Sequence, residues 1–105
     1  METIYGKDLD QLIEQQKVVV IDVRDNEDYR QKHIYGAYNL PYTTYKNRLK
    51  YLNKNYTYVL YCTHGILSYQ VAKKMEGEGF HVMSLMDGIE KYHGKYIWIV
   101  NSNLK

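Results

Sequence analysis

Two short apolar runs constrain the fold of this chain more than any other feature of its sequence. They occupy residues 18–21, Val-Val-Val-Ile, and residues 57–61, Thr-Tyr-Val-Leu-Tyr. Neither run shows the strict alternation of apolar and polar residues that marks a strand with one face in water. Continuous runs of this length are typical of strands buried on both faces of a parallel sheet. The core of the chain is therefore expected to form around such a sheet.

The segments around these runs alternate between helical and strand-like patterns. Apolar residues at helical spacing, or an acid-first and base-last order, predict helices over residues 7–16, 26–32, 44–52, 68–78 and 89–92. Further strands are expected over residues 37–40, 81–85 and 96–100, the last without a clear partner. Ser68 is expected to cap its helix and Gly79 to end it. Strands separated by helices predict an α/β fold, a small parallel β-sheet flanked by helices, with right-handed crossovers.

Length and composition indicate the class of protein. A chain of 105 residues with 45% hydrophobic and 25% charged residues suits one packed domain, expected to span residues 1–105. The formal net charge of +2 gives no indication of nucleic acid as a partner. No membrane span and no signal peptide are recognisable, so no membrane partner is expected. A single cysteine can form no internal disulfide, which favours the cytoplasm. The oligomeric state stays open.

Both buried runs end in side chains that carry chemistry. Asp22-Val-Arg24 follows the first run and Cys62 follows the second. In a parallel sheet these ends lie at the edge where ligands bind. The loop of residues 62–67 leads into a helix, so backbone N–H groups and the helix dipole would favour the Cys62 thiolate, and Gly65 lets the loop turn inward. Cys62 is thus either a small buried hydrophobe or a nucleophile that forms a covalent intermediate.

Two stretches of the sequence resemble the rhodanese family. The first contains Asp22-Val-Arg24, Glu27-Asp-Tyr29 and His33-Ile-Tyr-Gly-Ala-Tyr-Asn-Leu-Pro41. The second contains Cys62-Thr-His-Gly-Ile-Leu-Ser68, followed by Gly79-Phe80 and Asp87-Gly88-Ile89. The motifs stand in the family's order and at its spacing, and they span roughly residues 18–92, most of the chain.

The resemblance implies a sulfurtransferase that works without a cofactor. It would move sulfane sulfur from thiosulfate or a persulfide to cyanide, a thiol or a protein, through a persulfide on Cys62. The substrate-binding loop that follows would comprise Thr63, His64, Gly65, Ile66, Leu67 and Ser68. Asp22 and Arg24 support the site, either as a structural ion pair or through positive potential from Arg24. A persulfide carrier or protein-interaction module with little small-molecule turnover is the alternative.

The sequence departs from the family pattern in three places, the cysteine loop, the residue before the motif His, and the Gly-Gly-Ile turn. Many relatives carry Arg or Lys just before the loop Ser, where this chain has Ile66 and Leu67. Without that cation, His64 is the only group in the loop that can gain a positive charge, and anionic donors such as thiosulfate are expected to bind weakly. Lys32 replaces a Gly before the motif His, and Asp87 replaces the first Gly of a Gly-Gly-Ile turn.

Two other chemistries fit the sequence poorly. A cysteine phosphatase needs Arg at the seventh position of its loop, where it holds the phosphate bidentately. Counted from Cys62, that position is Ser68, and no Arg follows it in the chain. A zinc site needs Cys and His at characteristic spacings, and the four His residues and one Cys match none of them. No metal is therefore expected.

Overall fold

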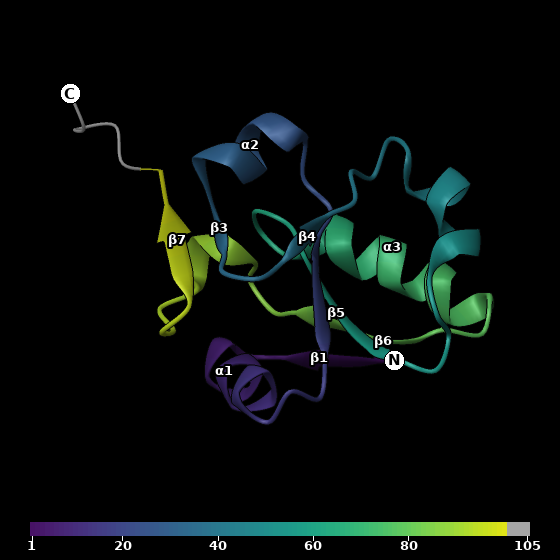
Figure 1. Ribbon diagram of the computed structural model, residues 1–105, viewed down its shortest axis with the longest axis horizontal. Helices are drawn as coiled ribbons and strands as arrows, with labels where there is room; N and C mark the ends of the chain where they lie inside the picture. The colour runs from purple at the N-terminus through teal and green to yellow at the C-terminus, as the bar shows by residue number, and fades with distance from the viewer. Residues whose placement is uncertain (101–105) are drawn as a thin grey trace.

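The computed structural model describes residues 1–100, so residues 101–105 of the expected domain lie outside it. Five parallel strands form the central sheet in the order β1-β6-β5-β2-β4 (Figure 1). Their bounds along this order are Glu2–Ile4, His81–Leu85, Thr57–Tyr61, Val19–Asp22 and Tyr38–Asn39. The predicted α/β fold with a parallel sheet flanked by helices is confirmed.

Helices cover both faces of this sheet and bury the two apolar runs. The α-helices are α1 (Gly6–Glu14), α2 (Asn26–Gln31) and α3 (Ile66–Gly77), and two 3₁₀ helices are η1 (Tyr45–Tyr51) and η2 (Ile89–Lys91). Successive strand residues point to opposite faces. Tyr58 and Leu60 of β5 therefore join one core cluster, with α3 and η1, while Val59 joins the other, with α1 and η2. This double burial explains the lack of polar alternation. In the described part of the chain, no helix is both long and apolar enough to cross a membrane.

A second, two-stranded sheet holds the end of the described chain. Strand β7 (Ile97–Ile99) pairs antiparallel with β3 (Lys32–Ile34), so the strand expected over residues 96–100 does have a partner. Because Lys32 enters β3, helix α2 ends one residue earlier than predicted. The segment that leads into β7 is tied to α1, since the Tyr92 hydroxyl and the Lys95 N–H both donate to the Asp10 carboxylate.

The start of α3 differs from the sequence prediction. The helix begins at Ile66, and its N-cap is Gly65 in the left-handed region (φ 99°), so the prediction that Ser68 caps it was wrong. The Ser68 hydroxyl lies instead in a buried cluster beside Cys62 and Ser84. The other end follows expectation, because Gly79 (φ 95°) stands just beyond the last helical turn. Strand β1 was not predicted.

Candidate active site

The two reactive strand ends lie side by side. Strands β2 and β5 are neighbours, with Asp22 of β2 in register with Tyr61 of β5. Cys62 directly follows Tyr61, so it stands at the same carboxyl edge of the sheet as Asp22 and Arg24. The parallel sheet thus brings together the residues that the sequence singled out.

Hydrogen bonds converge on the sulfur of Cys62. Its Sγ accepts the N–H of Gly65 at 3.1 Å and the N–H of Ser68 at 3.3 Å. The thiol lies 3.5 Å from the Ser68 hydroxyl oxygen, to which it donates. Amide dipoles and the first turn of a helix stabilise negative charge on an atom held this way. The arrangement therefore favours an anionic sulfur.

Four other backbone N–H groups of the loop are available as hydrogen-bond donors. Within residues 1–100, no hydrogen-bond acceptor faces the N–H groups of Thr63, His64, Ile66 and Leu67. The first-turn N–H groups of a helix point toward its N-terminal end, which for α3 is the loop that holds Cys62. The loop therefore has donors to spare for a ligand or for a second sulfur atom.

The turn between β6 and η2 fixes the backbone of this loop. The N–H groups of Ile89 and Glu90 donate to the carbonyls of Cys62 and Thr63 at 2.9 and 3.0 Å. Gly88 lies so close that a Cβ there would stand 2.3 Å from the Thr63 carbonyl oxygen. Asp87, which replaces a family Gly, adopts a positive φ of 64°. Asp87, which departs from the family pattern, therefore lies in a turn that contacts the cysteine loop.

Asp22 and Arg24 form a buried ion pair. The guanidinium Nη2 and Nε donate to the Asp22 carboxylate at 2.8 and 3.1 Å, and the Arg24 N–H donates to it at 2.8 Å. Nη2 also donates to the Lys32 carbonyl oxygen. Burial alone would lower the pKa of Arg24, but the hydrogen bonds and charge of Asp22 outweigh it and raise that pKa. This geometry is that of a structural ion pair.

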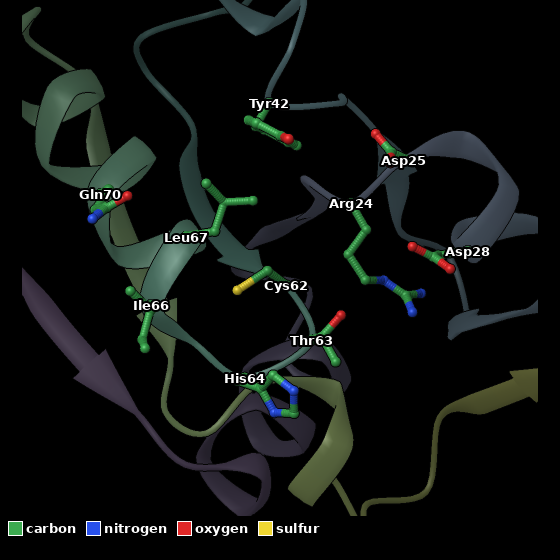
Figure 2. Close-up of a pocket in the computed structure, with 10 residues that line it drawn as sticks. All are labelled: Arg24, Asp25, Asp28, Tyr42, Cys62, Thr63, His64, Ile66, Leu67 and Gln70. Carbon is green, nitrogen blue, oxygen red and sulfur yellow. The ribbon is translucent and has the colours of Figure 1, made fainter.

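An open cleft of about 310 Å³ lies in front of Cys62. Although Cys62 is only 4% exposed, Figure 2 shows it in the middle of the side chains that line this cleft. The lining residues are Arg24, Asp25, Asp28, Tyr42, Cys62, Thr63, His64, Ile66, Leu67 and Gln70. Six of the nine residues that the sequence singled out are among them. Gly65, Ser68 and Asp22 support the cleft from behind its surface.

Sequence reasoning missed several residues of this site. Asp25, Asp28, Tyr42 and Gln70 line the cleft, and Ser84 of β6 lies 2.9 Å from the Ser68 hydroxyl beneath the sulfur. For two of these residues, the sequence position gives an indication of their place in the site. Asp25 directly follows Arg24, and Gln70 stands four residues after Ile66 on the same helix face. Among residues 1–100, no three His, Cys, Asp or Glu side chains gather as a metal site would require.

The fold and the site together define a class of protein: a parallel α/β domain with one cysteine in the loop between a central strand and a helix. The sequence profile of the family described as "Rhodanese-like domain" matches residues 6–95, nearly the whole chain. The chain therefore belongs to the family of rhodanese-like domains.

Known proteins with similar sequence and structure agree with this assignment. The chain is 32% identical over 83 residues to "Thiosulfate sulfurtransferase GlpE" of Coxiella burnetii, which covers 78% of each chain. It is 31% identical over 77 residues to "Putative sulfur carrier protein YrkF" of Bacillus subtilis, covering 72% of this chain and 42% of that protein. The crystal structure of a rhodanese-related protein from Thermoplasma volcanium has the same fold, with a TM-score of 0.88 and 22% identity over 95% of this chain and 100% of that one.

Proposed function

We propose that this protein is a sulfurtransferase that carries sulfane sulfur as a persulfide on Cys62. The observation that carries the proposal is the set of amides around its sulfur: two N–H groups already bind Sγ, and further loop N–H groups have no acceptor among the described residues. Family membership and the similarity to a thiosulfate sulfurtransferase support the same chemistry.

In the first step the Cys62 thiolate attacks the outer sulfur of a donor. With thiosulfate, the S–S bond breaks, its electron pair leaves on sulfite, and the sulfur stays on Cys62 as a persulfide anion. With an organic persulfide, the leaving group is a thiolate. The Gly65 and Ser68 N–H groups, which donate to Sγ at 3.1 and 3.3 Å, orient the nucleophile and interact favourably with negative charge on it.

In the second step an acceptor removes the outer sulfur. Cyanide, a thiol or a protein thiolate attacks it, the S–S bond breaks again, and the electron pair returns to Sγ of Cys62. Between the steps, the loop N–H groups of Thr63, His64, Ile66 and Leu67 are available to the outer sulfur anion. Amides fixed in advance, by a loop that the Gly88 turn holds in place, need no reorganisation when the charge arrives.

A sulfur carrier with little small-molecule turnover is the second candidate. Ile66 is 72% exposed where many relatives have a cation, so the mouth of the site has weak attraction for an anionic donor and an apolar surface for a protein. The similarity to a protein named as a putative sulfur carrier favours the same interpretation. In either role a working thiol suits a reducing compartment, and we infer the cytoplasm.

The test is sulfur loading followed by turnover. The protein is incubated with thiosulfate or with an organic persulfide, and its intact mass is measured. We expect the mass to rise by one sulfur atom, a gain that Cys62→Ser abolishes, and we expect cyanide to release the sulfur as thiocyanate. Loading with little thiocyanate turnover would favour the carrier role. If no donor adds sulfur to Cys62, both roles are wrong.

A further inference from the structure

The cleft at Cys62 has two walls of opposite character. Ile66 and Leu67, from the start of α3, form one wall, and Asp25 and Asp28, from the start of α2, form the other (Figure 2). Cys62 lies between the two walls, and in this view the Arg24 side chain lies between Cys62 and the two Asp residues. A ligand that reaches the sulfur therefore meets apolar surface on one side and, on the other, Arg24 with the carboxylates of Asp25 and Asp28 beyond it.

The two carboxylates pair with no other side chain in the described part of the chain. Asp25 occupies the N-cap of α2, yet its side chain makes no capping hydrogen bond. Within residues 1–100, neither Asp25 nor Asp28 takes part in a side-chain hydrogen bond or an ion pair. In contrast, the buried carboxylate of Asp22 receives three N–H groups of Arg24. The charges of Asp25 and Asp28 are therefore free to act on whatever enters the cleft.

The cation of the cleft does not offset these charges. Arg24 is the one Lys or Arg among the lining residues, and Asp22 already pairs with it through two guanidinium nitrogens. The charge of Asp28 also acts on Arg24 and contributes to the rise in its pKa. His64 lies exposed at the mouth. The formal charges of Asp25 and Asp28 thus leave the lining of the cleft with an excess of negative side chains.

We propose that the sulfur donor of this site is a small organic persulfide whose tail carries an ammonium group. This inference rests on the proposed function. The donor's carbon atoms contact Ile66 and Leu67, and its ammonium group faces Asp25 and Asp28. A cleft of about 310 Å³ matches a donor of a few non-hydrogen atoms, at the small end of ligand sites. Thiosulfate, a dianion, is repelled by the same two residues.

The transfer needs no further reactant. The Cys62 thiolate attacks the outer sulfur of R–S–SH, a new S–S bond forms to Sγ, and the old S–S bond breaks. Its electron pair leaves on R–S⁻, and the proton stays on the transferred sulfur, which gives Cys62–S–SH. Asp25 and Asp28 take no part in bond making and act only on how the donor is bound and oriented.

The experiment compares three persulfides with tails of equal length and different charge. Aminoethyl, hydroxyethyl and sulfonatoethyl persulfide are each mixed with the protein, and the second-order rate of sulfur loading is followed by intact mass. We expect the ammonium donor to load about tenfold faster than the neutral one, and the sulfonate donor and thiosulfate to load most slowly. The differences should shrink as ionic strength rises, because salt screens exposed charges.

Two variants assign the effect to the cleft. Asp25→Asn/Asp28→Asn should slow the ammonium donor and speed the sulfonate donor and thiosulfate, each by about tenfold relative to hydroxyethyl persulfide, whose rate measures any general effect of the variant on loading. Glu27→Gln is the matched control, because Glu27 is an exposed acid of the same helix that does not line the cleft. If the double variant fails to fold, Asp25→Asn alone should shift the rates in the same direction.

The outcomes separate this inference from the proposed function. If all three persulfides load Cys62 at one rate, or if their order stays unchanged in the double variant, the donor assignment is overturned while the sulfurtransferase remains. An equal shift in Glu27→Gln would also overturn it, because the effect would then follow net charge alone. If no donor loads Cys62, the proposed function itself fails and the donor assignment falls with it.

Discussion

The ends of β2 and β5 lie side by side at one edge of the sheet, and they use polar groups in opposite ways. At the end of β2, Asp22 and Arg24 are buried and satisfy one another. At the end of β5, the donors converge on one sulfur, and four further amides of the loop have no acceptor in the described chain. One end is closed and the other is open.

This contrast indicates that the ion pair has a structural role, whereas the loop amides are available to a ligand. A guanidinium already bound to a carboxylate and to the Lys32 carbonyl contributes little net positive charge to the cleft. Backbone amides, in contrast, carry no net charge, and those without an acceptor among residues 1–100 remain able to donate to a ligand in the cleft. The negative charge of a persulfide would therefore be stabilised by dipoles, and the ion pair would hold the loops in place around them.

Asp22→Ala tests the ion pair at the end of β2, and it should have the largest effect. Removing this carboxylate leaves the Arg24 guanidinium buried without its partner, and we expect the free energy of unfolding to fall by about 3–5 kcal/mol. Urea unfolding followed by circular dichroism measures it. The double variant Asp22→Leu/Arg24→Met should recover most of the loss, because neither charge remains. A loss below about 1 kcal/mol in Asp22→Ala would show that the pair does not hold the fold.

Gly88→Ala tests the turn that holds the cysteine loop at the end of β5. A Cβ at Gly88 would stand 2.3 Å from the Thr63 carbonyl oxygen, whereas a Cβ at Gly36, also at positive φ, would meet nothing within 4 Å. Gly36→Ala should therefore cost about 1–2 kcal/mol from its backbone conformation alone. Gly88→Ala should cost a further ~1–3 kcal/mol from overlap and slow sulfur loading. Equal losses in the two variants would argue against the turn as a brace for the loop.

The hydroxyl beneath the sulfur gives a smaller effect. Ser68→Ala removes a group 3.5 Å from Sγ, and we expect loading to slow by about tenfold, since hydrogen bonds to charged groups are worth about 1.5–3 kcal/mol. Ser84→Ala removes a buried hydroxyl that touches Ser68 but forms no hydrogen bond with the sulfur. It should lower stability by about 1 kcal/mol and slow loading less. Stopped-flow loading rates compare them, and a larger kinetic effect in Ser84→Ala would reverse the assignment.

The smallest effect is expected from Asp87→Gly. Asp87 holds a φ of 64°, which glycine adopts without steric cost, so the unfolding midpoint should rise by an amount equivalent to less than about 1 kcal/mol. The greater freedom of glycine in the unfolded chain offsets part of the gain. Thermal unfolding measures it. A lower midpoint would show that the Asp87 side chain stabilises the turn more than its backbone strains it.

Much of the fold could be predicted because its signals are local. The runs at β5 and β6 are short and largely apolar, and both predicted ranges match the observed Thr57–Tyr61 and His81–Leu85. Strand β1 could not be found, because three residues with only Ile4 buried show no periodicity. The partner of β7 depends on β3, more than sixty residues earlier, and no local pattern encodes that pairing.

The candidate site likewise combines residues that a local sequence pattern predicts with residues that only tertiary packing brings together. The loop around Cys62 is continuous in sequence, so its motif and its place before a helix were readable. The start of α3 was misplaced because a hydroxyl three residues into the helix resembles a cap, and only packing against Ser84 draws it inward. Asp25 and Asp28 enter the cleft through the orientation of α2 against the cysteine loop, a tertiary arrangement that the acid-first pattern of that helix does not specify.

The most direct test is a crystal structure of the protein after loading with an organic persulfide. We expect one added sulfur atom bonded to Sγ of Cys62, lying in the cleft within hydrogen-bonding distance of loop N–H groups, with the Asp22–Arg24 pair unchanged. An unmodified Cys62 after loading, or an outer sulfur bound to an Arg24 guanidinium that has left Asp22, would overturn the proposed role of the loop amides.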